Sequence, residues 1–300
     1  MTPVRRIAFL GLGLIGGSIA RALRERPTRS ERGIGVDERI ELVAWSPSGD
    51  GPAAAFAAGV IDANVDDPVR AVEGADLVVL AGPALRVVEA IRALAPMADG
   101  RTALGPTTTV TDVASTKVAV IDAADEARLP VVGGHPMAGR ESSGFPSADP
   151  SLFVDRPWVV VPGRHARGDD IERVEWLARA VGARPITATA ADHDAAVAAI
   201  SHLPLVVAAA LAEAVAGGAE WASSLGHELA SGGWLSSTRV ARGEPSMGAS
   251  ILATNARPTA TAIRSFRAAL DDWLEALETE EPDVAAIRDR LARARFALER

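Results

Sequence analysis

The stretch "RRIAFLGLGLIGGSIARAL", residues 5–23, decides the fold of the first part of the chain. Ile7–Leu10 is branched or aromatic enough to predict a strand that is buried on both faces. The residues from Ser18 to Leu23 have the composition of a helix. The glycines between them therefore occupy a strand-to-helix turn, as in the nucleotide-binding unit of α/β proteins.

Each glycine of this turn has a physical task. Gly11 permits the tight turn, Gly13 lets the backbone approach a phosphate, and Gly16 allows close packing of the helix on the sheet. The free N–H groups and the dipole at the helix N-terminus attract a negatively charged ligand. The turn thus predicts a dinucleotide site, with Gly11, Gly13, Leu14, Ile15 and Gly16 as cofactor-binding residues. A plain glycine-rich turn in another α/β domain is the alternative.

The composition limits the class of protein. The chain has 300 residues, 48% of them hydrophobic, which suggests one or two globular domains. A net charge of -8 without a basic cluster argues against a nucleic-acid partner. There are 0 cysteines and 5 histidines, and the histidines lack metal-ligand spacing, so no metal site is expected. No export signal is evident at the N-terminus, and we expect a cytoplasmic protein.

One stretch is long enough to cross a bilayer. Residues Ala195–Ala219 are largely alanine but include His202, Pro204 and Glu213. We interpret the stretch as a core helix of a helical domain and expect no membrane partner.

The order of apolar runs predicts two domains. Strands are expected at Ile40–Trp45, Ala75–Ala81, Thr107–Val113, Pro130–Val132 and Trp158–Val161, with a polar loop at Pro27–Arg39. Strands that alternate with crossovers predict a parallel sheet covered by helices. From Asp192 onward the pattern is helical and is interrupted by glycine pairs, the first at Gly217-Gly218. The fold class is therefore α/β, with a Rossmann-type doubly wound domain at 1–188 and an all-helical domain at 189–300, whose first helix Asp192 or Asp194 would cap.

Ligands of an open parallel sheet bind beyond the carboxyl ends of its strands. Gly82 and Pro83 follow one strand and either line the cofactor groove or form a simple turn. Ser115 and Lys117 in "TDVASTK" follow another; a helix cap and a solvated charge are the alternatives. His135 follows two glycines and, in a glycine-rich loop, is suited to acid–base chemistry, although a hydrogen-bonded loop histidine is also possible.

The helical half carries further polar groups. Asp194 and Ser201 are expected on one helix face, two turns apart. His193 is interpreted as a surface or capping residue, whereas His202 either supports the site or packs in the core. Arg239 and Arg242 stand in a segment with few charges, as surface residues or as carboxylate ligands.

Five motifs together resemble one family. "GLGLIGGS", "TDVASTK", "GGHPMAGRESSG", "DHD…SHLP" and "GGWLSSTRVA" occur in the order and approximate spacing of the prephenate and arogenate dehydrogenase family, over nearly the whole chain. The resemblance implies oxidative decarboxylation of prephenate or arogenate in tyrosine biosynthesis, and a homodimer formed by the helical domain. It implies His135 as acceptor for the substrate hydroxyl, Ser115 and Lys117 beside it, Arg239 on the ring carboxylate, and Ser201 and Gly232 on the substrate side chain.

Some positions depart from the family's pattern. Leu205 replaces a frequent histidine, Ser236 a common aspartate and Gly248 an aromatic residue, which leaves the choice of cyclohexadiene substrate open. Ser46 stands where an NAD site normally has an acid, and Pro47 where an NADP site often has an arginine. We expect NAD, with NADP as the alternative. A dehydrogenase of another small hydroxy acid and a catalytically idle dinucleotide sensor remain the alternative functions.

Overall fold

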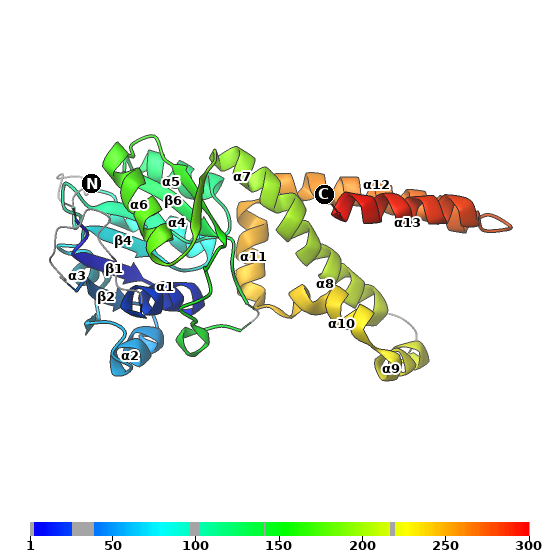
Figure 1. The fold of residues 1–300 in the computed structure, drawn as a ribbon, viewed down its shortest axis with the longest axis horizontal. Helices are drawn as coiled ribbons and strands as arrows, with labels where there is room; N and C mark the ends of the chain where they lie inside the picture. Colours follow the sequence, from blue (N-terminus) through cyan, green and yellow to red (C-terminus); the bar gives the residue numbers. More distant parts are fainter. Residues whose placement is uncertain (1–2, 26–38, 97–101, 141, 217–219, 300) are drawn as a thin grey trace. The chain divides into compact units, whose positions relative to one another are not determined.

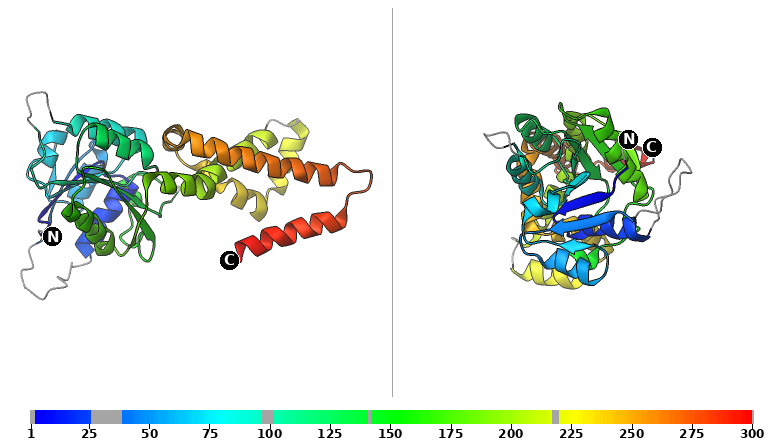
Figure 2. Two further views of the ribbon diagram at one scale, coloured as in Figure 1. Left: turned by 90° about the horizontal axis from the view of Figure 1, so that it is seen from above. Right: turned by 90° about the vertical axis from the view of Figure 1, so that its left-hand side faces the viewer.

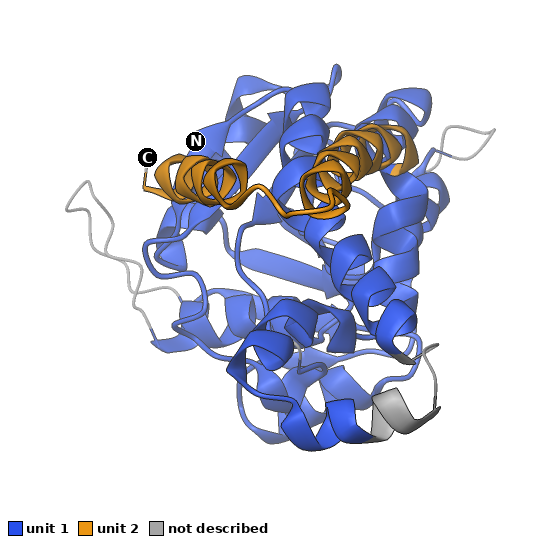
Figure 3. Ribbon diagram, turned by 90° about the vertical axis from the view of Figure 1, so that its right-hand side faces the viewer, with its two compact units in different colours: residues 1–255 blue, residues 256–300 orange. Residues whose placement is uncertain are grey.

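The structure is a computed structural model that describes residues 3–25, 39–96, 102–140, 142–216 and 220–299, with the backbone alone at 216 and 220–224. The expected loop before Arg39 and the interruption at Gly217-Gly218 lie outside the described residues. Two compact units are present, residues 1–255 and 256–300 (Figure 3). The first contains the sheet and the helices through α11, and the second contains two helices.

An eight-stranded sheet forms the centre of the first unit (Figure 1). Its order is β3-β2-β1-β4-β5-β6-β7-β8, and all neighbours are parallel except β6 and β7. The strands are β1 (Arg6–Leu10), β2 (Glu41–Trp45), β3 (Ala63–Asn64), β4 (Leu77–Leu80), β5 (Thr109–Asp112), β6 (Val131–Pro136), β7 (Pro157–Pro162) and β8 (Arg184–Thr187). The predicted Rossmann-type fold class is confirmed.

Helices cover both faces of this sheet (Figure 2). They are α1 (Leu14–Glu25), α2 (Asp50–Ala57), α3 (Pro68–Val72), α4 (Ala84–Leu94), α5 (Val118–Glu126) and α6 (Gly168–Ala180), with a 3-10 turn η1 (Phe145–Ser147). Ile7 and Phe9 of β1 pack in one hydrophobic cluster with α1 and α6, whereas Ala8 and Leu10 pack in another with α3, α4 and α5. This alternation of side chains explains why the strand is apolar along its whole length.

The strand order reverses beside β1, and this reversal positions the glycine turn. β1 pairs with β2 on one side and with β4 on the other. Gly11 follows β1 directly, and its N–H donates to the carbonyl of Trp45 at 2.7 Å, while Ala81 donates to Leu10 at 2.8 Å. Dinucleotides bind at such a switch point in α/β sheets.

The sequence-based boundaries differ from the structure at two strands. β3 and β8 were not expected, because β3 has two residues and the four residues of β8 include an arginine, a proline and a threonine. β6 also continues beyond the expected Val132 as far as Pro136. His135 therefore lies within a strand, paired with Val159 of β7, and not in a glycine-rich loop.

The remaining described elements are helical. They are α7 (Ala190–Val197), a π-helical turn η2 (Ala198–His202), α8 (Leu203–Ala216), α9 (Glu220–Leu229), α10 (Gly232–Thr238), a 3-10 turn η3 (Arg239–Arg242), α11 (Pro245–Thr254), α12 (Ala256–Leu277) and α13 (Val284–Leu298). The expected cap of the first helix was wrong, because Thr189 caps α7 by accepting from the N–H of Asp192 at 3.1 Å. Asp194 instead points to α5, as described below.

Hydrogen bonds join part of this helical segment to the sheet domain. The Ser250 hydroxyl of α11 accepts from the N–H of Leu85 in α4 at 3.0 Å, and Thr254 lies 2.8 Å from Thr116 through their hydroxyls. These contacts explain why the first compact unit extends to Asn255. In the second unit, α13 pairs with α12 through an Arg290–Asp272 ion pair of 2.6 Å.

The helical run Ala190–Val215 is long and apolar enough to cross a membrane, with a mean hydropathy of 2.1. A single such helix is weak evidence for a membrane span, because core helices of soluble proteins, which are mostly buried, pass the same test. Only 22% of its most apolar window is buried, so much apolar surface of this run is uncovered in one copy of the chain.

Candidate active site

The glycine turn has little space for side chains at two of its three glycines. Gly11 has a φ of +98°, and a Cβ there would lie 2.1 Å from the Ala81 carbonyl oxygen. At Gly16 a Cβ would lie 2.9 Å from the Gly11 oxygen. At Gly13 a Cβ would meet nothing within 4 Å, so the backbone there is open to a ligand. Leu14 and Ile15 begin α1, whose first N–H groups lack helical partners. These features fit a bound pyrophosphate.

A pocket of about 600 Å³ lies at the carboxyl ends of β2 and β3. Ser46 and Ser48 line it from the β2 side, and Asp66 and Arg70 line it from the β3 side. Asp66 and Arg70 form an exposed ion pair of 3.3 Å. Neither group could be predicted from the sequence, because β3 has only two residues. The pocket thus offers a carboxylate for ribose hydroxyls and a guanidinium for a 2′-phosphate.

Gly82 and Pro83 follow β4 at the same edge of the sheet as Gly11. Both are half-buried, and Pro83 is the N-cap residue of α4. Neither residue lines the pocket beside Ser46.

A buried ion pair connects the end of β5 to the start of α5. Lys117 is 0% exposed, and its ammonium donates to the carboxylate of Asp112. Asp112 also accepts from the N–H of Ala114 at 2.8 Å and of Gly134 at 3.1 Å. Burial lowers the pKa of Lys117, and Asp112 opposes that shift. The alternative of a solvated surface charge at Lys117 was wrong.

His135 occupies its place because the two residues before it are glycines. A Cβ on Gly134 would lie 2.5 Å from the Asp112 carbonyl oxygen, and one on Gly133 would lie 3.0 Å from Cδ of Lys117. The glycines thus allow β6 to pass close to the Asp112–Lys117 pair, and they do not form a loop. His135 then stands at the carboxyl end of β6, 9% exposed.

His135 contacts a second buried histidine that the sequence analysis placed at the surface. His193 is 4% exposed, and its Nε2 lies 2.8 Å from Nδ1 of His135. Nδ1 of His193 lies 2.7 Å from the Asp194 carboxylate. The surface interpretation of His193 was wrong because α7 packs against α5, which turns this side of α7 inward.

Asp194 ties this cluster to the start of α5. Its two carboxylate oxygens accept from the N–H of Lys117 at 2.7 Å and of Val118 at 2.9 Å. They therefore cap α5 from a distant part of the sequence. Ser115, half-buried in the same turn, has no hydrogen-bond partner among the described residues.

Burial and the neighbouring Lys117 ammonium disfavour the protonated form of His135. Desolvation lowers the pKa of His135 well below its ordinary value, and the positive charge of Lys117 adds to this shift. Nε2 of His135 has no hydrogen-bond partner in the part of the chain that the structure describes. A neutral imidazole with one free nitrogen at the sheet edge is able to accept a proton from a ligand hydroxyl.

His202 supports the same region from η2. Its Nδ1 lies 3.0 Å from the amide nitrogen of Asn255, which also donates to the Asp194 carbonyl at 2.8 Å. His202 is 1% exposed, and its Nε2 is buried without a partner among the described residues. Burial is the main cause that lowers the pKa of His202, to about 4.

The proposed substrate ligands lie on the helical segment. Ser201 is exposed in η2, whereas Asp194 is buried, so the two do not share a face. The wider π-helical turn between them changes the side-chain direction that α-helical spacing would give. Gly232 and Arg239 are exposed on α10 and η3, which both pack against α8 (Figure 1).

Two of the positions that depart from the family's pattern are neighbours. A Cβ on Gly248 of α11 would lie 3.6 Å from Cδ2 of Leu205 in α8. The departures from the family's pattern at Leu205 and Gly248 therefore alter one patch between α8 and α11.

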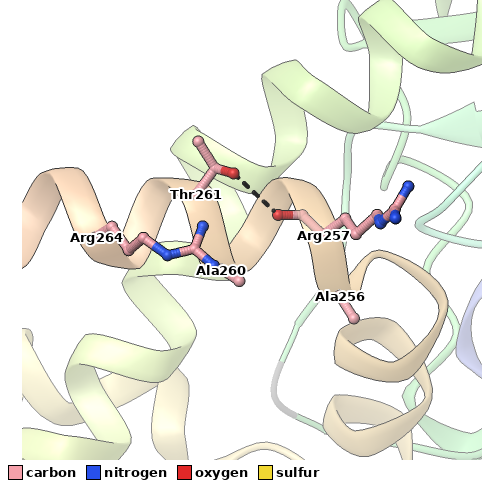
Figure 4. A pocket seen from close by; sticks show the side chains of 5 residues that line it. All are labelled: Ala256, Arg257, Ala260, Thr261 and Arg264. Carbon is pink, nitrogen blue, oxygen red and sulfur yellow. Dashed lines mark hydrogen bonds between the residues drawn. The ribbon is translucent and has the colours of Figure 1, made fainter.

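A further pocket of about 490 Å³ lies on α12 in the second unit (Figure 4). Arg257, Thr261 and Arg264 line it together with two alanines, and the Thr261 hydroxyl donates to the Arg257 carbonyl at 3.2 Å. None of the expected site residues belongs to it. Within the described ranges, no group of three His, Asp or Glu side chains is placed to hold a metal ion.

The depressed pKa of His202 makes stability dependent on pH. In the unfolded chain His202 binds a proton below about 6.5, whereas in the native state it does so only below about 4. The free energy of unfolding therefore falls as the pH is lowered through this window, by about 3 kcal/mol from His202. Urea denaturation at pH 7 and pH 4 should show a smaller pH effect for His202→Gln than for the wild type. His165→Gln, an exposed control, should retain the full effect, and equal pH effects in both variants would contradict the assignment.

Comparison with family models covers most of the chain. Residues 20–187 match the model described as the nucleotide-binding domain of prephenate dehydrogenase, and residues 189–292 match its dimerization domain. The first match ends at residue 187 and the second begins at residue 189.

Individual relatives agree with these matches. The chain is 33% identical to prephenate dehydrogenase of Bacillus subtilis over 252 residues, 83% of this chain and 64% of the relative, so it spans slightly less than two thirds of that protein. It is 31% identical to cyclohexadienyl dehydrogenase of Zymomonas mobilis, over 94% of this chain and 92% of the relative. The crystal structure of Synechocystis arogenate dehydrogenase is similar at a TM-score of 0.75 and 29% identity, covering 98% of this chain and 99% of that chain.

Proposed function

The chain belongs to the prephenate dehydrogenase family, and we propose that it catalyses the NAD(P)-dependent oxidative decarboxylation of prephenate or arogenate in tyrosine biosynthesis. The observation that carries the proposal is the position of His135. Its ring stands at the carboxyl edge of the sheet, the edge that also holds the glycine turn, with Nδ1 bonded to His193 and Nε2 free. An enzyme that oxidises a hydroxyl group requires such a proton acceptor beside its nucleotide site.

The proposed reaction uses one proton acceptor and one hydride acceptor. When bound, the nicotinamide supplies the hydride acceptor for the hydrogen on the ring carbon that bears the hydroxyl. His135 accepts the hydroxyl proton at Nε2. The bond to the ring carboxylate then breaks, its electron pair enters the ring, and carbon dioxide leaves. The oxygen takes the proton back from His135, so that the aromatic phenol forms without net proton release.

We further propose roles for the residues around His135. Ser115, half-buried in the turn before α5, orients the hydroxyl, and the buried Lys117 acts through its charge. Arg239 holds the ring carboxylate, while Ser201 and the Gly232 backbone contact the substrate side chain. The guanidinium fork supports the role of Arg239, because it matches a carboxylate with two parallel hydrogen bonds.

We propose domains at 1–188 and 189–300, the second of which binds substrate and forms a homodimer. Support comes from the match to a dimerization domain and from exposed leucines in that region, namely Leu211, Leu225, Leu229, Leu235, Leu270, Leu274, Leu277, Leu291 and Leu298. A second copy would cover such surface. The net charge of -8, without a basic cluster, supports the proposal that nucleic acid is not a partner.

Ser46 and Arg70 should decide between the two nicotinamide cofactors. We expect NAD as cofactor, because Asp66 supplies a carboxylate at the ribose pocket, and we expect Arg70 to permit NADP. Ser46→Asp should lower kcat/KM with NADP at least about 10-fold by repelling the 2′-phosphate, with little change for NAD. Arg70→Met should also lower kcat/KM with NADP. Arg92 is another exposed, ion-paired arginine, and Arg92→Met should leave kcat/KM unchanged. Equal NADP kinetics in all variants would remove this pocket from cofactor selection.

Absorbance at 340 nm with prephenate and arogenate, each paired with NAD and NADP, tests the proposed function. Reduction of the nicotinamide in any pairing supports the activity and identifies substrate and cofactor. Flat traces in all four pairings, with cofactor binding intact, would overturn it. Turnover of a small β-hydroxy acid instead would favour the other dehydrogenase class.

A further inference from the structure

Three buried side chains form a continuous chain of hydrogen bonds. The Asp194 carboxylate lies 2.7 Å from Nδ1 of His193, and Nε2 of His193 lies 2.8 Å from Nδ1 of His135. The three residues are 1%, 4% and 9% exposed. The two rings meet edge to face, at an interplanar angle of 74°. Each ring is thus held by its neighbour and has little contact with water.

The chemistry of these groups fixes the direction of each bond. A carboxylate only accepts hydrogen bonds, so Nδ1 of His193 donates to Asp194. A neutral imidazole carries one proton, which leaves Nε2 of His193 as an acceptor. Nδ1 of His135 must then carry the proton of its own ring and donate it. The nitrogen of His135 that lacks a proton is Nε2.

We propose that His193 is a positioning residue that holds His135 in the tautomer with the proton on Nδ1, and that Asp194 orients His193 for this task. Its kinetic consequence rests on the proposed function, whereas the tautomer is a property of the resting protein. His135 then presents Nε2 as a ready proton acceptor. When Nε2 of His135 takes a proton, the hydrogen bonds through His193 connect the new positive charge to the Asp194 carboxylate.

The neighbouring groups disfavour the reverse hydrogen bond, in which Nε2 of His193 donates to Nδ1 of His135. That direction requires a proton on Asp194 or a second proton on His193. Asp194 already accepts two backbone hydrogen bonds besides that of His193, from Lys117 and Val118. An additional positive charge on His135 is opposed by burial and by the Lys117 ammonium, although Asp112 pairs with that ammonium. His202, the other titratable group near the rings, has a pKa lowered to about 4 and is neutral at pH 7.

Nitrogen-15 NMR of histidine-labelled protein tests the tautomer directly. The chain has 5 histidines, and the signals of His135 are those that disappear in His135→Asn. At pH 7 the wild type should show a protonated Nδ1 and a proton-free Nε2 for His135. A proton on Nε2, or an even mixture of tautomers, would overturn the proposal.

Two variants of His193 test its consequence for turnover. His193→Phe keeps a flat ring but neither donor nor acceptor, so His135 should populate both tautomers. We expect kcat to fall by about 10²-fold or more, within the roughly 10⁴-fold that a wrong tautomer costs in a Ser-His-Asp site, with unchanged cofactor Kd. His193→Gln retains an amide donor and acceptor, and it should recover most of the loss.

An exposed histidine, His165, provides the matched control. His165→Phe replaces an exposed histidine and should leave kcat and the His135 signals unchanged. If His193 has only a structural role, both variants should be less stable and His193→Gln should not recover kcat. That result would contradict the proposal. If the wild type has the expected tautomer but oxidises no cyclohexadiene, the proposed function fails and the tautomer assignment stands.

Discussion

His135→Asn should lower kcat by about 10²–10⁴-fold, the usual contribution of a general acid–base group. The asparagine amide is able to donate to Nε2 of His193 as Nδ1 of His135 does, so the hydrogen-bonded cluster stays intact. It has no nitrogen that accepts a proton from the substrate. Steady-state kinetics and a cofactor titration should show a large loss of kcat and an unchanged Kd for the cofactor.

The pH dependence gives this prediction a second readout. Because burial and the charge of Lys117 lower the pKa of His135, the wild type should keep its kcat as the pH falls from 8 to 6. A simultaneous loss of kcat and of cofactor affinity in His135→Asn would indicate a structural role. His165→Asn, an exposed histidine, serves as the control and should have wild-type kinetics.

Lys117→Met should destabilise the protein by about 3–5 kcal/mol, the cost of leaving one charge of a buried ion pair without its partner. Asp112 and Lys117 are both 0% exposed, and the lost ammonium is one of the donors to the Asp112 carboxylate. Urea denaturation at pH 7 measures the difference in the free energy of unfolding.

A double variant separates the loss of charge balance from the loss of packing. Asp112→Asn combined with Lys117→Met removes both charges, and the asparagine oxygen still accepts from the Ala114 N–H. It should be more stable than Lys117→Met alone. If the double variant is the less stable of the two, unbalanced charge is not the cause of the loss.

The sequence predicted the parts of the fold that depend on local patterns. The apolar run before Gly11, the glycine turn and the helix after it are consecutive in the chain, and each leaves its own signal. His135 was found for the same reason, since it follows an apolar run and two glycines in the sequence. The parallel strands β1, β2 and β4 also matched, because strands buried on both faces are continuously apolar.

The parts that failed depend on packing between distant segments. Gly133 and Gly134 resemble a loop in the sequence, and only the closeness of Asp112 and Lys117 explains them as strand residues. His193 lies 58 residues from His135 along the chain, so its burial could not be predicted from the polar residues around it. The "DHD" motif drew attention to the segment but did not indicate its direction.

Two residues of the pocket beside Ser46 could not be predicted for a similar reason. Asp66 and Arg70 follow a strand of two residues, too short for a periodic signal, and reach the pocket only because β3 pairs with β2. Sequence reasoning at the end of β2 alone therefore gave an incomplete account of the ribose site.

The ratio of carbon dioxide released to nicotinamide reduced tests the central claim most directly. The substrate is prephenate or arogenate labelled in the ring carboxylate, with the preferred cofactor. The account predicts one molecule of labelled carbon dioxide for each molecule of reduced cofactor. In His135→Asn the rates of carbon dioxide release and of cofactor reduction should fall equally. Reduction of the cofactor without release of the label would show an ordinary alcohol oxidation and would contradict oxidative decarboxylation.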